Sequence, residues 1–431
     1  MCTKELYQLY LSHPSIQTDT RKLKKGDLFF ALKGPNYNGN QFAHQALEQG
    51  AAYAIVDELG SNGTHSATNN RIVLVHNVLA ALQELAKHHR QQFNIPFIAI
   101  TGSNGKTTSK ELIYAVLASH FNTHTTQGNL NNHIGVPLTI LSVPLNAQMA
   151  VIEMGANHQK EIESYCKYTL PTHGIITNCG KAHLEGFGGV EGVRKGKGEL
   201  YDFLRANKGT AFIYADYDYL QTMSAGIEEK IFYGTTKGLV HGHVAANEPF
   251  LTVSISEGLS VDCINTQLVG DYNLPNILCA AAIGKHFGVP DEKIKSAIEA
   301  YAPSNSRSQL IQQGSNQIIM DAYNANPSSM KLAVENFAHI QADKKVLLLG
   351  AMMELGQDSL MEHEALVNLI QQYPFNTVVL VGGDFEKINH PFIYFPNSLE
   401  AKAWLDAQHF ENAHLLIKGS RSFKMEAVIN T

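Results

Sequence analysis

Eight consecutive residues carry the clearest chemical signal in the chain, Thr101-Gly-Ser-Asn-Gly-Lys-Thr-Thr108. They follow an apolar run at 97–100 that predicts a buried strand, and they precede a helix expected from about Ser109. Backbone N–H groups of such a turn cradle phosphate oxygens, a lysine reaches the terminal phosphates, and a hydroxyl holds Mg²⁺. The first glycine lies only three residues before the second, which is shorter than the usual phosphate loop. A nucleotide site is predicted, with a purely structural turn as the alternative; its residues are Gly102, Ser103, Asn104, Gly105, Lys106, Thr107 and Thr108.

Three further polar residues could serve such a nucleotide. Glu153 ends an apolar run, and a carboxylate at the carboxyl end of a parallel strand is well placed to hold Mg²⁺; a helix-capping carboxylate is the alternative. His183 follows another strand end and could be a ligand or an acid/base, although most of the 20 histidines must be ordinary. Lys197, taken alone, predicts a solvated lysine on a helix face.

The elements that must position these groups repeat a strand-helix rhythm. Short apolar runs predict buried parallel strands, mostly followed by helices, at 97–100, 150–153, 174–177 and 211–214. The segment 231–263 alternates and contains turns, which predicts antiparallel strands, and helices are expected at 273–287 and 291–301. The last third repeats the rhythm and predicts a second doubly wound unit, with strands at 318–320, 346–349, 377–381 and 415–417. The first 80 residues predict a smaller α/β unit.

Length and composition agree with several folded domains. At about 150 residues per domain, 431 residues correspond to roughly three domains. The net charge of −6 argues against a surface built to bind nucleic acid. We see neither a secretory signal nor an apolar run near the ~20 residues that span a bilayer, so no membrane insertion is expected. The five scattered cysteines fit neither a disulfide framework nor a zinc site, which favours the reducing cytoplasm.

Six ordered segments together resemble the Mur ligases, the ATP-dependent amide-bond-forming enzymes of peptidoglycan synthesis, and within them the MurF type. The segments are Thr101–Thr108, Gln127–Pro137, Glu153–Asn157, Ala182–Gly188, Asp321–Pro327 and Lys418–Glu426. The resemblance covers nearly the whole chain and implies three α/β domains. These are a small N-terminal domain that binds the UDP precursor (1–94), a central P-loop ATPase with a mainly parallel sheet (95–304), and a C-terminal Rossmann-like domain (305–431).

The resemblance also implies a reaction. ATP and Mg²⁺ would drive the joining of UDP-N-acetylmuramoyl-tripeptide to D-alanyl-D-alanine through an acyl phosphate, with Lys106 offsetting the charge of the transferring phosphoryl group. Thr107 and Glu153 would position Mg²⁺, and His183 would help to hold a second ion. Lys197 aligns with the lysine that the family carries as a carbamate, a two-oxygen anionic ligand.

Four residues are carried over to the nucleotide. Asn273 and Asn276 match a helix start that faces adenine, or are two helix-capping asparagines. Arg307 matches an arginine that reaches the γ-phosphate, or forms a surface salt bridge. Asp321 matches the carboxylate on the ATP ribose, or caps a strand end.

Further residues are carried over to the two substrates, with turn chemistry or a buried polar loop as the alternative. The uridine diphosphate is expected near Asp19, Thr20, Arg21, Lys33 and Asn38, and the muramoyl-peptide side near Asn129, Asn131 and Asn132. The acceptor side is expected near Tyr323, Asn324 and Asn326, and the dipeptide carboxylate near Lys418, Ser420 and Arg421.

One position departs from the family, which often has an acidic residue where this chain has Ala351; Glu354 or His363 could substitute, or both could be surface residues. Other functions stay open: a sister amide ligase such as a folylpolyglutamate synthase, or a kinase or regulatory module that uses the phosphate loop without forming an amide. A monomer is expected, and the third residue of the tripeptide is not readable from the sequence.

Overall fold

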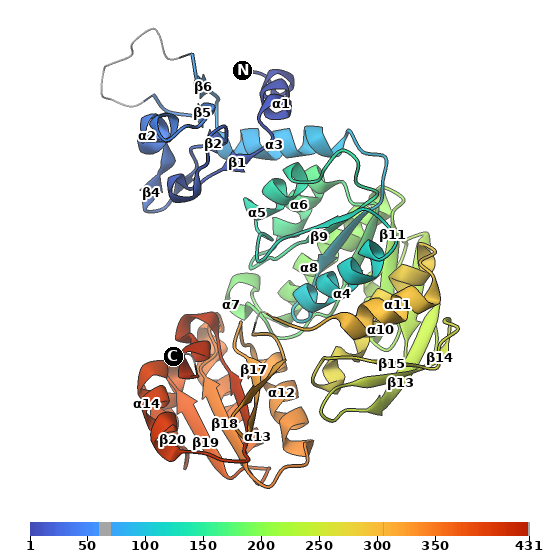
Figure 1. Cartoon of the computed structure of the whole chain (residues 1–431), viewed down its shortest axis with the longest axis vertical. Helices are drawn as coiled ribbons and strands as arrows, with labels where there is room; N and C mark the ends of the chain where they lie inside the picture. The colour runs from blue at the N-terminus through green and yellow to red at the C-terminus, as the bar shows by residue number, and fades with distance from the viewer. Residues whose placement is uncertain (60–69, 305, 430–431) are drawn as a thin grey trace. The chain divides into compact units, whose positions relative to one another are not determined.

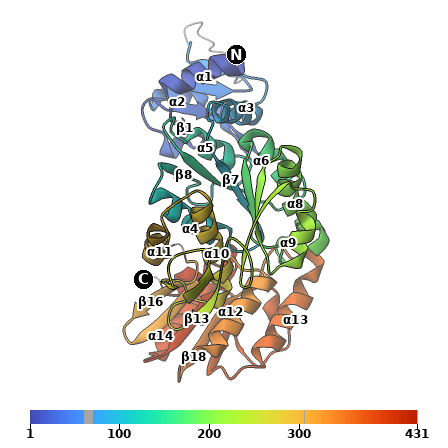
Figure 2. The same ribbon diagram turned by 90° about the vertical axis from the view of Figure 1, so that its right-hand side faces the viewer.

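The computed structural model describes residues 1–59, 70–304 and 306–429, and it is an α/β protein built on three main sheets (Figures 1 and 2). A four-stranded sheet lies within 16–74, a nine-stranded sheet within 97–265 and a six-stranded sheet within 309–418. Most strand pairs run parallel. The predicted fold class, α/β with a mainly parallel central sheet, is confirmed. The chain forms two compact units, which are described separately.

The first unit comprises Met1–Ala99, Asn122–Gly155 and Ile162–Thr172. Its four-stranded sheet has the order β1-β2-β5-β6 with all pairs parallel, and α2 packs on it over a core that includes Phe29, Ala46 and Ala54. The elements are α1 (Thr3–Ser12), β1 (Ile16–Gln17), β2 (Leu28–Phe30), β3 (Lys33–Gly34), β4 (Tyr37–Asn38), α2 (Ala43–Glu48), β5 (Tyr53–Val56), β6 (Ile72–Leu74), α3 (Val78–Arg90), β8 (Thr123–Thr125), α5 (Gly135–Leu141), β9 (Met149–Glu153) and most of α6 (Glu161–Thr169).

Three helices of this unit are joined by buried polar contacts. The Tyr7 hydroxyl of α1 and Nδ1 of His89 in α3 are 3.0 Å apart, and the other ring nitrogen of His89 lies 2.9 Å from the carbonyl of Val143. Tyr10 donates to the carbonyl of Leu141 at the end of α5. Burial lowers the pKa of His89, which favours the neutral ring that these contacts need.

The second unit comprises Ile100–Phe121, Ala156–Glu161 and His173–Thr431. Its helices are α4 (Lys106–Ala118), α7 (Leu184–Phe187), α8 (Val190–Ala206), α9 (Asp218–Met223), α10 (Leu274–His286), α11 (Asp291–Ala300), α12 (Pro327–His339), α13 (Ser359–Ile370) and α14 (Ser398–Gln408). Its strands are β10 (His173–Ile176), β11 (Thr210–Tyr214), β12 (Glu229–Gly234), β13 (Val240–Ala246), β14 (Thr252–Glu257), β15 (Cys263–Asn265), β16 (Gln309–Gln313), β17 (Asn316–Asp321), β18 (Lys345–Gly350), β19 (Thr377–Val381), β20 (Ile393–Phe395) and β21 (His414–Lys418).

The nine-stranded sheet has the order β15-β14-β13-β12-β11-β10-β7-β9-β8, and the units divide within β7 (Phe97–Thr101). In Figure 2, α4 and α10 lie on one side of the strands of the second unit and α8 and α9 on the other. The predicted antiparallel segment is right for β13, β14 and β15 but wrong for β12, which is parallel to both neighbours. The crossover helix α9 returns the chain before β12, so this strand continues the parallel part of the sheet.

The helix that follows the phosphate loop begins earlier than predicted. Residue Lys106, and not Ser109, is the first residue of α4, because Gly105 takes φ +78° and turns the chain directly into the helix. This left-handed turn suits glycine, which has no Cβ to clash. The lysine and the two threonines therefore occupy the first helical turn, where backbone N–H groups have no partner within the helix.

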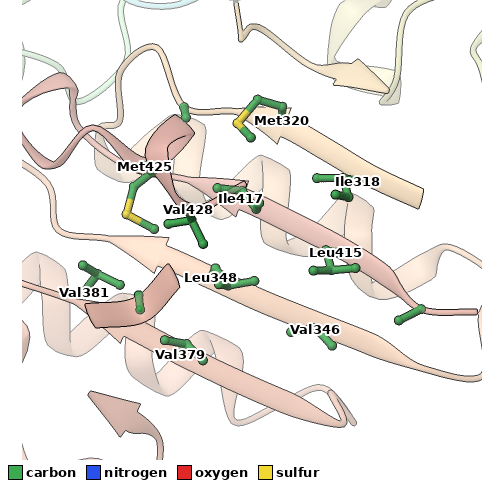
Figure 3. Close-up of a cluster of buried hydrophobic side chains, with 13 residues drawn as sticks. Ile318, Met320, Val346, Leu348, Val379, Val381, Leu415, Ile417, Met425 and Val428 are labelled. Atoms are coloured by element: carbon green, nitrogen blue, oxygen red, sulfur yellow. The ribbon is translucent and has the colours of Figure 1, made fainter. Parts of the chain in front are cut away.

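The six-stranded sheet has the order β16-β17-β21-β18-β19-β20, parallel except for the β16–β17 pair. Figure 3 shows the cluster of buried side chains on one face of this sheet, among them Val346, Leu348, Leu415 and Ile417. All four predicted strands are present, and the two edge strands β16 and β20 were not predicted. Edge strands are short or polar because only part of their surface packs on the core, so their sequences carry a weak signal.

No helix in the described residues is long and apolar enough to cross a membrane. Within the described residues, which include all five cysteines, no disulfide is formed.

We expect Ile417→Ala to destabilise the C-terminal sheet by about 2–5 kcal/mol, because Ile417 is fully buried in a central strand and its truncation leaves a cavity. Trp404, the only tryptophan, packs against this core, so its fluorescence during urea unfolding reports on the domain concerned. Leu399→Ala is the matched control, because Leu399 is 69% exposed and should change stability by less than about 0.5 kcal/mol. Equal effects of the two substitutions would contradict the assignment of this core.

Candidate nucleotide site

The loop between β7 and α4 has room only for glycine at two positions. A Cβ on Gly102 would lie 2.0 Å from Thr177 Oγ1, and φ there is +146°. A Cβ on Gly105 would lie 2.7 Å from Asn276 Oδ1. The backbone therefore approaches its neighbours closely and leaves the N–H groups at the start of α4 to face a ligand, as in a phosphate loop.

Two residues that follow β10 hold this loop from behind. Asn178 accepts from the backbone N–H of Ser103 through its carbonyl (2.9 Å) and from that of Asn104 through Oδ1 (3.0 Å). The Thr177 hydroxyl donates to the carbonyl of Asn104 at 2.6 Å. The sequence analysis did not single out Thr177 and Asn178. Their signal was available, because both follow a buried strand of a parallel sheet, where ligand-supporting residues gather.

Lys106 folds back over the loop that precedes it. Its Nζ donates to the carbonyls of Gly102 (2.7 Å) and Ser103 (3.1 Å). Thr107, in the same turn of α4, is buried, and Thr108 is half-buried. The ammonium group thus sits at the mouth of the loop, where a lysine can meet terminal phosphates.

The start of α10 is tied to the phosphate-loop helix. Asn276 Oδ1 accepts from Ser109 Oγ of α4 at 2.9 Å, and Asn276 Nδ2 donates to Asn273 Oδ1 at 2.9 Å. The Asn273 side chain in turn donates to the carbonyl of Val269. Both asparagines are buried, and these bonds differ from those of helix caps. The structure therefore brings the two predicted adenine-side residues together beside the loop.

Lys197 lies inside α8 with only 1% of its surface exposed, so the interpretation as a solvated lysine is wrong. Its Nζ donates to the carbonyl of Ala156 at 3.0 Å and lies 4.9 Å from the centre of the Phe187 ring. Burial, together with the positive charge of Lys106, lowers the pKa of Lys197 to about 7. A substantial fraction of this amine is consequently neutral near pH 7.

Glu153 and the three asparagines near it belong to the first unit. The Glu153 carboxylate is buried and accepts from Asn131 Nδ2 at 2.7 Å, while its backbone N–H donates to Thr126 Oγ1. Asn132 Oδ1 accepts from the backbone N–H groups of Ile134 and Gly135, where α5 begins, and Asn129 is exposed. Asn131 thus pairs with a predicted metal ligand, whereas Asn132 supports its own loop.

His183 lies opposite a carboxylate from the loop that follows β18. Its Nδ1 is 2.5 Å from Oε2 of Glu354, and the His183 side chain holds the pKa of Glu354 below its usual range. Lys181 Nζ is likewise 2.5 Å from Oε1 of Glu362. Within the described residues no three His, Cys, Asp or Glu side chains come together to hold a metal ion. His183 therefore pairs with one acid and joins no ready-made metal cluster.

The C-terminal candidates form a connected polar group. Lys418, buried in β21, donates to Asp321 Oδ2 at 2.5 Å and lies 3.4 Å from the carbonyl of Asn324. Asn326 caps α12 by accepting from Ser329 and donates to Asn104 Oδ1 in the phosphate loop at 2.7 Å. The side-chain oxygen of Asn326 therefore stabilises its own turn, as the alternative predicted, while its amide nitrogen contacts the phosphate loop.

Ser420 and Arg421, predicted for the dipeptide carboxylate, and Arg307, predicted for the γ-phosphate, each have a partner in the C-terminal part of the second unit. The buried Ser420 hydroxyl accepts from the backbone N–H of Met353 at 3.0 Å. Arg421 donates to Glu426 at 3.0 Å, and the Arg307 guanidinium lies 3.7 Å from the centre of the Tyr323 ring.

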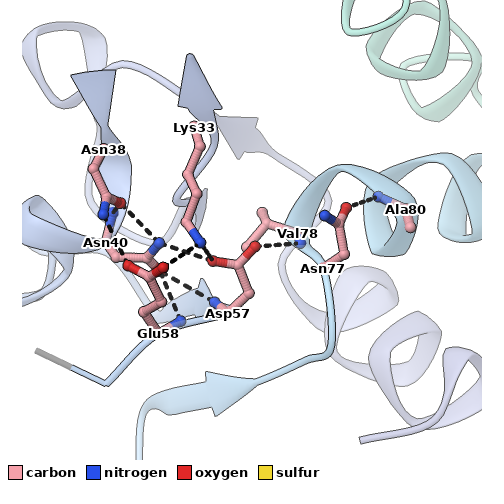
Figure 4. A network of polar contacts seen from close by, with 8 residues as sticks. All are labelled: Lys33, Asn38, Asn40, Asp57, Glu58, Asn77, Val78 and Ala80. Carbon is pink, nitrogen blue, oxygen red and sulfur yellow. Dashed lines mark hydrogen bonds and ion pairs between the residues drawn. The ribbon is translucent and has the colours of Figure 1, made fainter. Parts of the chain in front are cut away.

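The predicted diphosphate residues of the first unit are paired with acids. Asp19 accepts from the Arg21 guanidinium at 2.7 and 2.9 Å, with Thr20 in the turn between them. Figure 4 shows Lys33 between Asp57 Oδ1 (2.8 Å) and Glu58 Oε1 (2.7 Å), with Asn38 donating to Glu58. The charge of each of these two cations is therefore already balanced within the protein.

Ala351 and His363 are both buried inside the protein. Ala351 is fully buried, and a Cβ on Gly383 would lie 2.4 Å from the Ala351 Cβ, so a larger residue would crowd this turn. His363 is also fully buried, where its Nε2 accepts from the backbone N–H of Met352 at 3.0 Å. The alternative of a surface residue is wrong for His363, whereas Glu354 is half-exposed.

Three family descriptions match consecutive parts of the chain: the Mur ligase family catalytic domain at 14–90, the Mur ligase middle domain at 100–284 and the Mur ligase glutamate ligase domain at 306–421. UDP-N-acetylmuramoyl-tripeptide–D-alanyl-D-alanine ligase of Bacillus subtilis is 36% identical over 343 residues, covering 79% of this chain and 74% of that protein. The chain belongs to the Mur ligase family.

Solved Mur ligase structures share its fold over nearly the whole length. MurF from Acinetobacter baumannii has a TM-score of 0.87 at 28% identity, covering 98% of this chain and 97% of that one. MurF from Thermotoga maritima, solved in complex with ADP, has a TM-score of 0.86 at 25% identity, covering 97% of both chains. The three-domain architecture of the Mur ligases is therefore that of this chain as well.

The burial of Lys197 makes the stability of this Mur ligase depend on pH. Its pKa is about 7 in the folded protein against 10.5 ordinarily, so between these values the unfolded chain binds the extra proton. Unfolding free energy therefore rises with pH across this window through Lys197, and its burial penalty is complete below about pH 7. We expect wild type to gain stability relative to Lys197→Met as pH rises from 7 to 10, measured by thermal unfolding in CO₂-free buffer. Lys195→Met, on the exposed side of the same helix, should show no such trend, and an unchanged difference for Lys197→Met would contradict the burial of a charged lysine.

Proposed function

We propose that this Mur ligase joins the free carboxyl group of UDP-N-acetylmuramoyl-tripeptide to the amino group of D-alanyl-D-alanine, with ATP converted to ADP and phosphate. The observation that carries this proposal is the tight phosphate loop with Lys106 at its mouth. The name of the Bacillus subtilis relative, at 36% identity, supports the choice of substrates. The ADP complex of the similar Thermotoga maritima enzyme supports ATP as the nucleotide.

The chemistry requires activation of a poor acyl donor. The carboxylate oxygen takes the γ-phosphoryl group and ADP leaves; the amine then attacks the acyl carbon, an amide forms, and phosphate and a proton are released. Phosphoryl transfer between anions needs positive charge and N–H donors at the transferring group. Lys106 and the first turn of α4 would supply both, and Arg307 would meet the γ-phosphate.

Mg²⁺ would neutralise phosphate charge in this reaction. Mg²⁺ keeps several water molecules and commonly binds through one or two protein oxygens plus phosphates. The predicted residues fit this mode by their chemistry, since Thr107 offers a hydroxyl oxygen and Glu153 a carboxylate, the hard oxygen donors that Mg²⁺ prefers. Thr107 and Glu153 would each give one oxygen ligand. His183 is a weaker candidate for a second ion because its Nδ1 already faces Glu354.

Lys197 would act as a carbamate. The ammonium group would lose one proton, and the neutral amine would then attack CO₂ and release a second, which leaves an anion with two ligand oxygens in place of a cation. Burial and the lowered pKa of about 7 favour the neutral amine that this step needs.

The other candidates keep their proposed roles. Asn273 and Asn276 would lie on the adenine side, and Asp321 would bind the ribose once it separates from Lys418. The substrate side would comprise Asp19, Thr20, Arg21, Lys33, Asn38, Asn129, Asn131, Asn132, Tyr323, Asn324, Asn326, Lys418, Ser420 and Arg421. The domain boundaries 1–94, 95–304 and 305–431 are supported by the separate family matches. A cytoplasmic monomer stays a prediction.

The first experiment measures phosphate release from ATP and Mg²⁺ with UDP-N-acetylmuramoyl-tripeptide, with and without D-alanyl-D-alanine, together with mass detection of the pentapeptide. We expect product only when both substrates are present. Lys106→Ala should abolish turnover, because the charge at the transferring phosphate is lost, while Lys195→Ala should retain it. Turnover only with another amine or with folate would move the function to a sister ligase, and phosphate release with neither substrate would indicate a regulatory ATPase.

We expect Lys197→Ala to lose most activity and short carboxylic acids to restore part of it, because they replace the two carbamate oxygens. The measurement is product formation over a series of acetate and formate concentrations. Lys195→Ala is the control, with full activity and no response to acid. A correctly folded Lys197→Ala enzyme that no acid rescues would sink the carbamate hypothesis.

A further inference from the structure

Arg307 lies in the short segment between α11 and β16, and its backbone is fixed on both sides. Ser306 and Ser308 take φ of 51° and 50°, a left-handed conformation that residues other than glycine rarely adopt. Each is held by a residue at or after the end of β17: the Tyr323 N–H donates to the Ser306 carbonyl (3.2 Å), and the Ser308 N–H donates to Asp321 Oδ1 (3.1 Å). Arg307 is therefore pinned against the end of β17.

The support for this segment extends into buried groups. The Ser308 hydroxyl is 2.9 Å from the Tyr272 hydroxyl, and Asp321 is paired with the buried Lys418. Tyr272 directly precedes Asn273 at the start of α10, so the segment is anchored both beside the proposed adenine side and at the C-terminal sheet. These bonds set the backbone of Arg307 and leave the direction of its side chain to be explained.

The side chain of Arg307 rests on an aromatic ring. Its guanidinium carbon lies 3.7 Å from the centre of the Tyr323 ring, well within the range of a cation–π contact. Its Nε is buried and has no hydrogen-bond partner among the described residues. Arg421 lies 5.8 Å from the same ring and is held by Glu426. The ring face is thus the contact that directs the Arg307 guanidinium.

We propose that Tyr323 is a positioning residue of the nucleotide site, whose ring face holds the Arg307 guanidinium in the orientation in which it meets the γ-phosphate. This inference rests on the proposed function, in which Arg307 contacts that phosphate. In this proposal the aromatic ring of Tyr323 orients the guanidinium, and the Tyr323 hydroxyl group has no part in it. It also predicts discrimination between nucleotides, because ADP lacks the phosphate concerned.

The test compares Tyr323→Leu with Tyr323→Phe in the full-length enzyme. Leucine fills similar space without a π face, whereas phenylalanine keeps the face and removes only the hydroxyl. Calorimetric titration with Mg²⁺ and either ADP or the non-hydrolysable analogue adenylyl imidodiphosphate separates the γ-phosphate from the rest of the nucleotide. We expect Tyr323→Leu to weaken analogue binding by about 2- to 30-fold and to leave ADP binding unchanged, and Tyr323→Phe to bind both as wild type does.

Arg307→Ala supplies the control that separates this inference from the proposed function. Arg307→Ala alone should weaken the analogue selectively, and adding Tyr323→Leu to it should cost nothing more, because the ring acts through the arginine. Selective loss in Arg307→Ala without loss in Tyr323→Leu would overturn the positioning role alone. No selective loss in Arg307→Ala would overturn the proposed role of the arginine as well. Equal weakening of ADP and analogue by Tyr323→Leu would show a merely structural ring, and weaker analogue binding by Tyr323→Phe would assign the role to the hydroxyl group; either result would overturn the proposal.

Discussion

A loop that binds phosphate through its backbone must keep some of its N–H groups for the ligand, so its shape needs support from elsewhere. In this chain the support for the loop between β7 and α4 comes from Thr177 and Asn178 after β10, which bond to the Ser103 and Asn104 backbone. The approach is so close that Gly102 has no space for a side chain. Much of the second unit follows from this constraint, because β10, α4 and α10 must each meet the loop at a set place.

Close packing in the second unit also lowers the pKa of Lys197. A lysine with 1% of its surface exposed loses its hydration, and Lys106 adds a second positive charge in the same region. Two lysines placed so that one lowers the pKa of the other would be a poor choice for stability alone. The arrangement agrees with the proposed function, in which Lys106 would stay charged to meet phosphate and Lys197 would react as a neutral amine.

The sequence was informative where a short local pattern determines the structure. The strand before Gly102, the strand that ends at Glu153 and the four inner strands of the C-terminal sheet are apolar runs whose burial leaves few alternatives. It was uninformative for β16 and β20, which lie at edges and bury little. The pairing of Lys33 with Asp57 and Glu58 also could not be predicted, because it joins residues more than 20 positions apart that belong to or follow strands of different sheets.

Lys197 shows the same limit most clearly, since its neighbours in sequence, Lys195 and Arg194, are charged and its burial depends on how α8 packs on the sheet. The family resemblance identified Lys197 as a site residue, and the packing of α8 explains why its side chain is buried.

The segment 178–185 contacts both the phosphate loop and the C-terminal part of the second unit. Its first residue holds the phosphate loop, and its later residues contact the C-terminal part of the second unit: Lys181 meets Glu362, and His183 meets Glu354. Asn104 in the loop also bonds to Asn326, which caps α12. A shift of the C-terminal sheet would therefore pull on the segment that holds the loop and on the loop itself. If nucleotide binding shifts the loop, these contacts would transmit the shift to that sheet, and a shift of the sheet would in turn change nucleotide affinity by the same free energy.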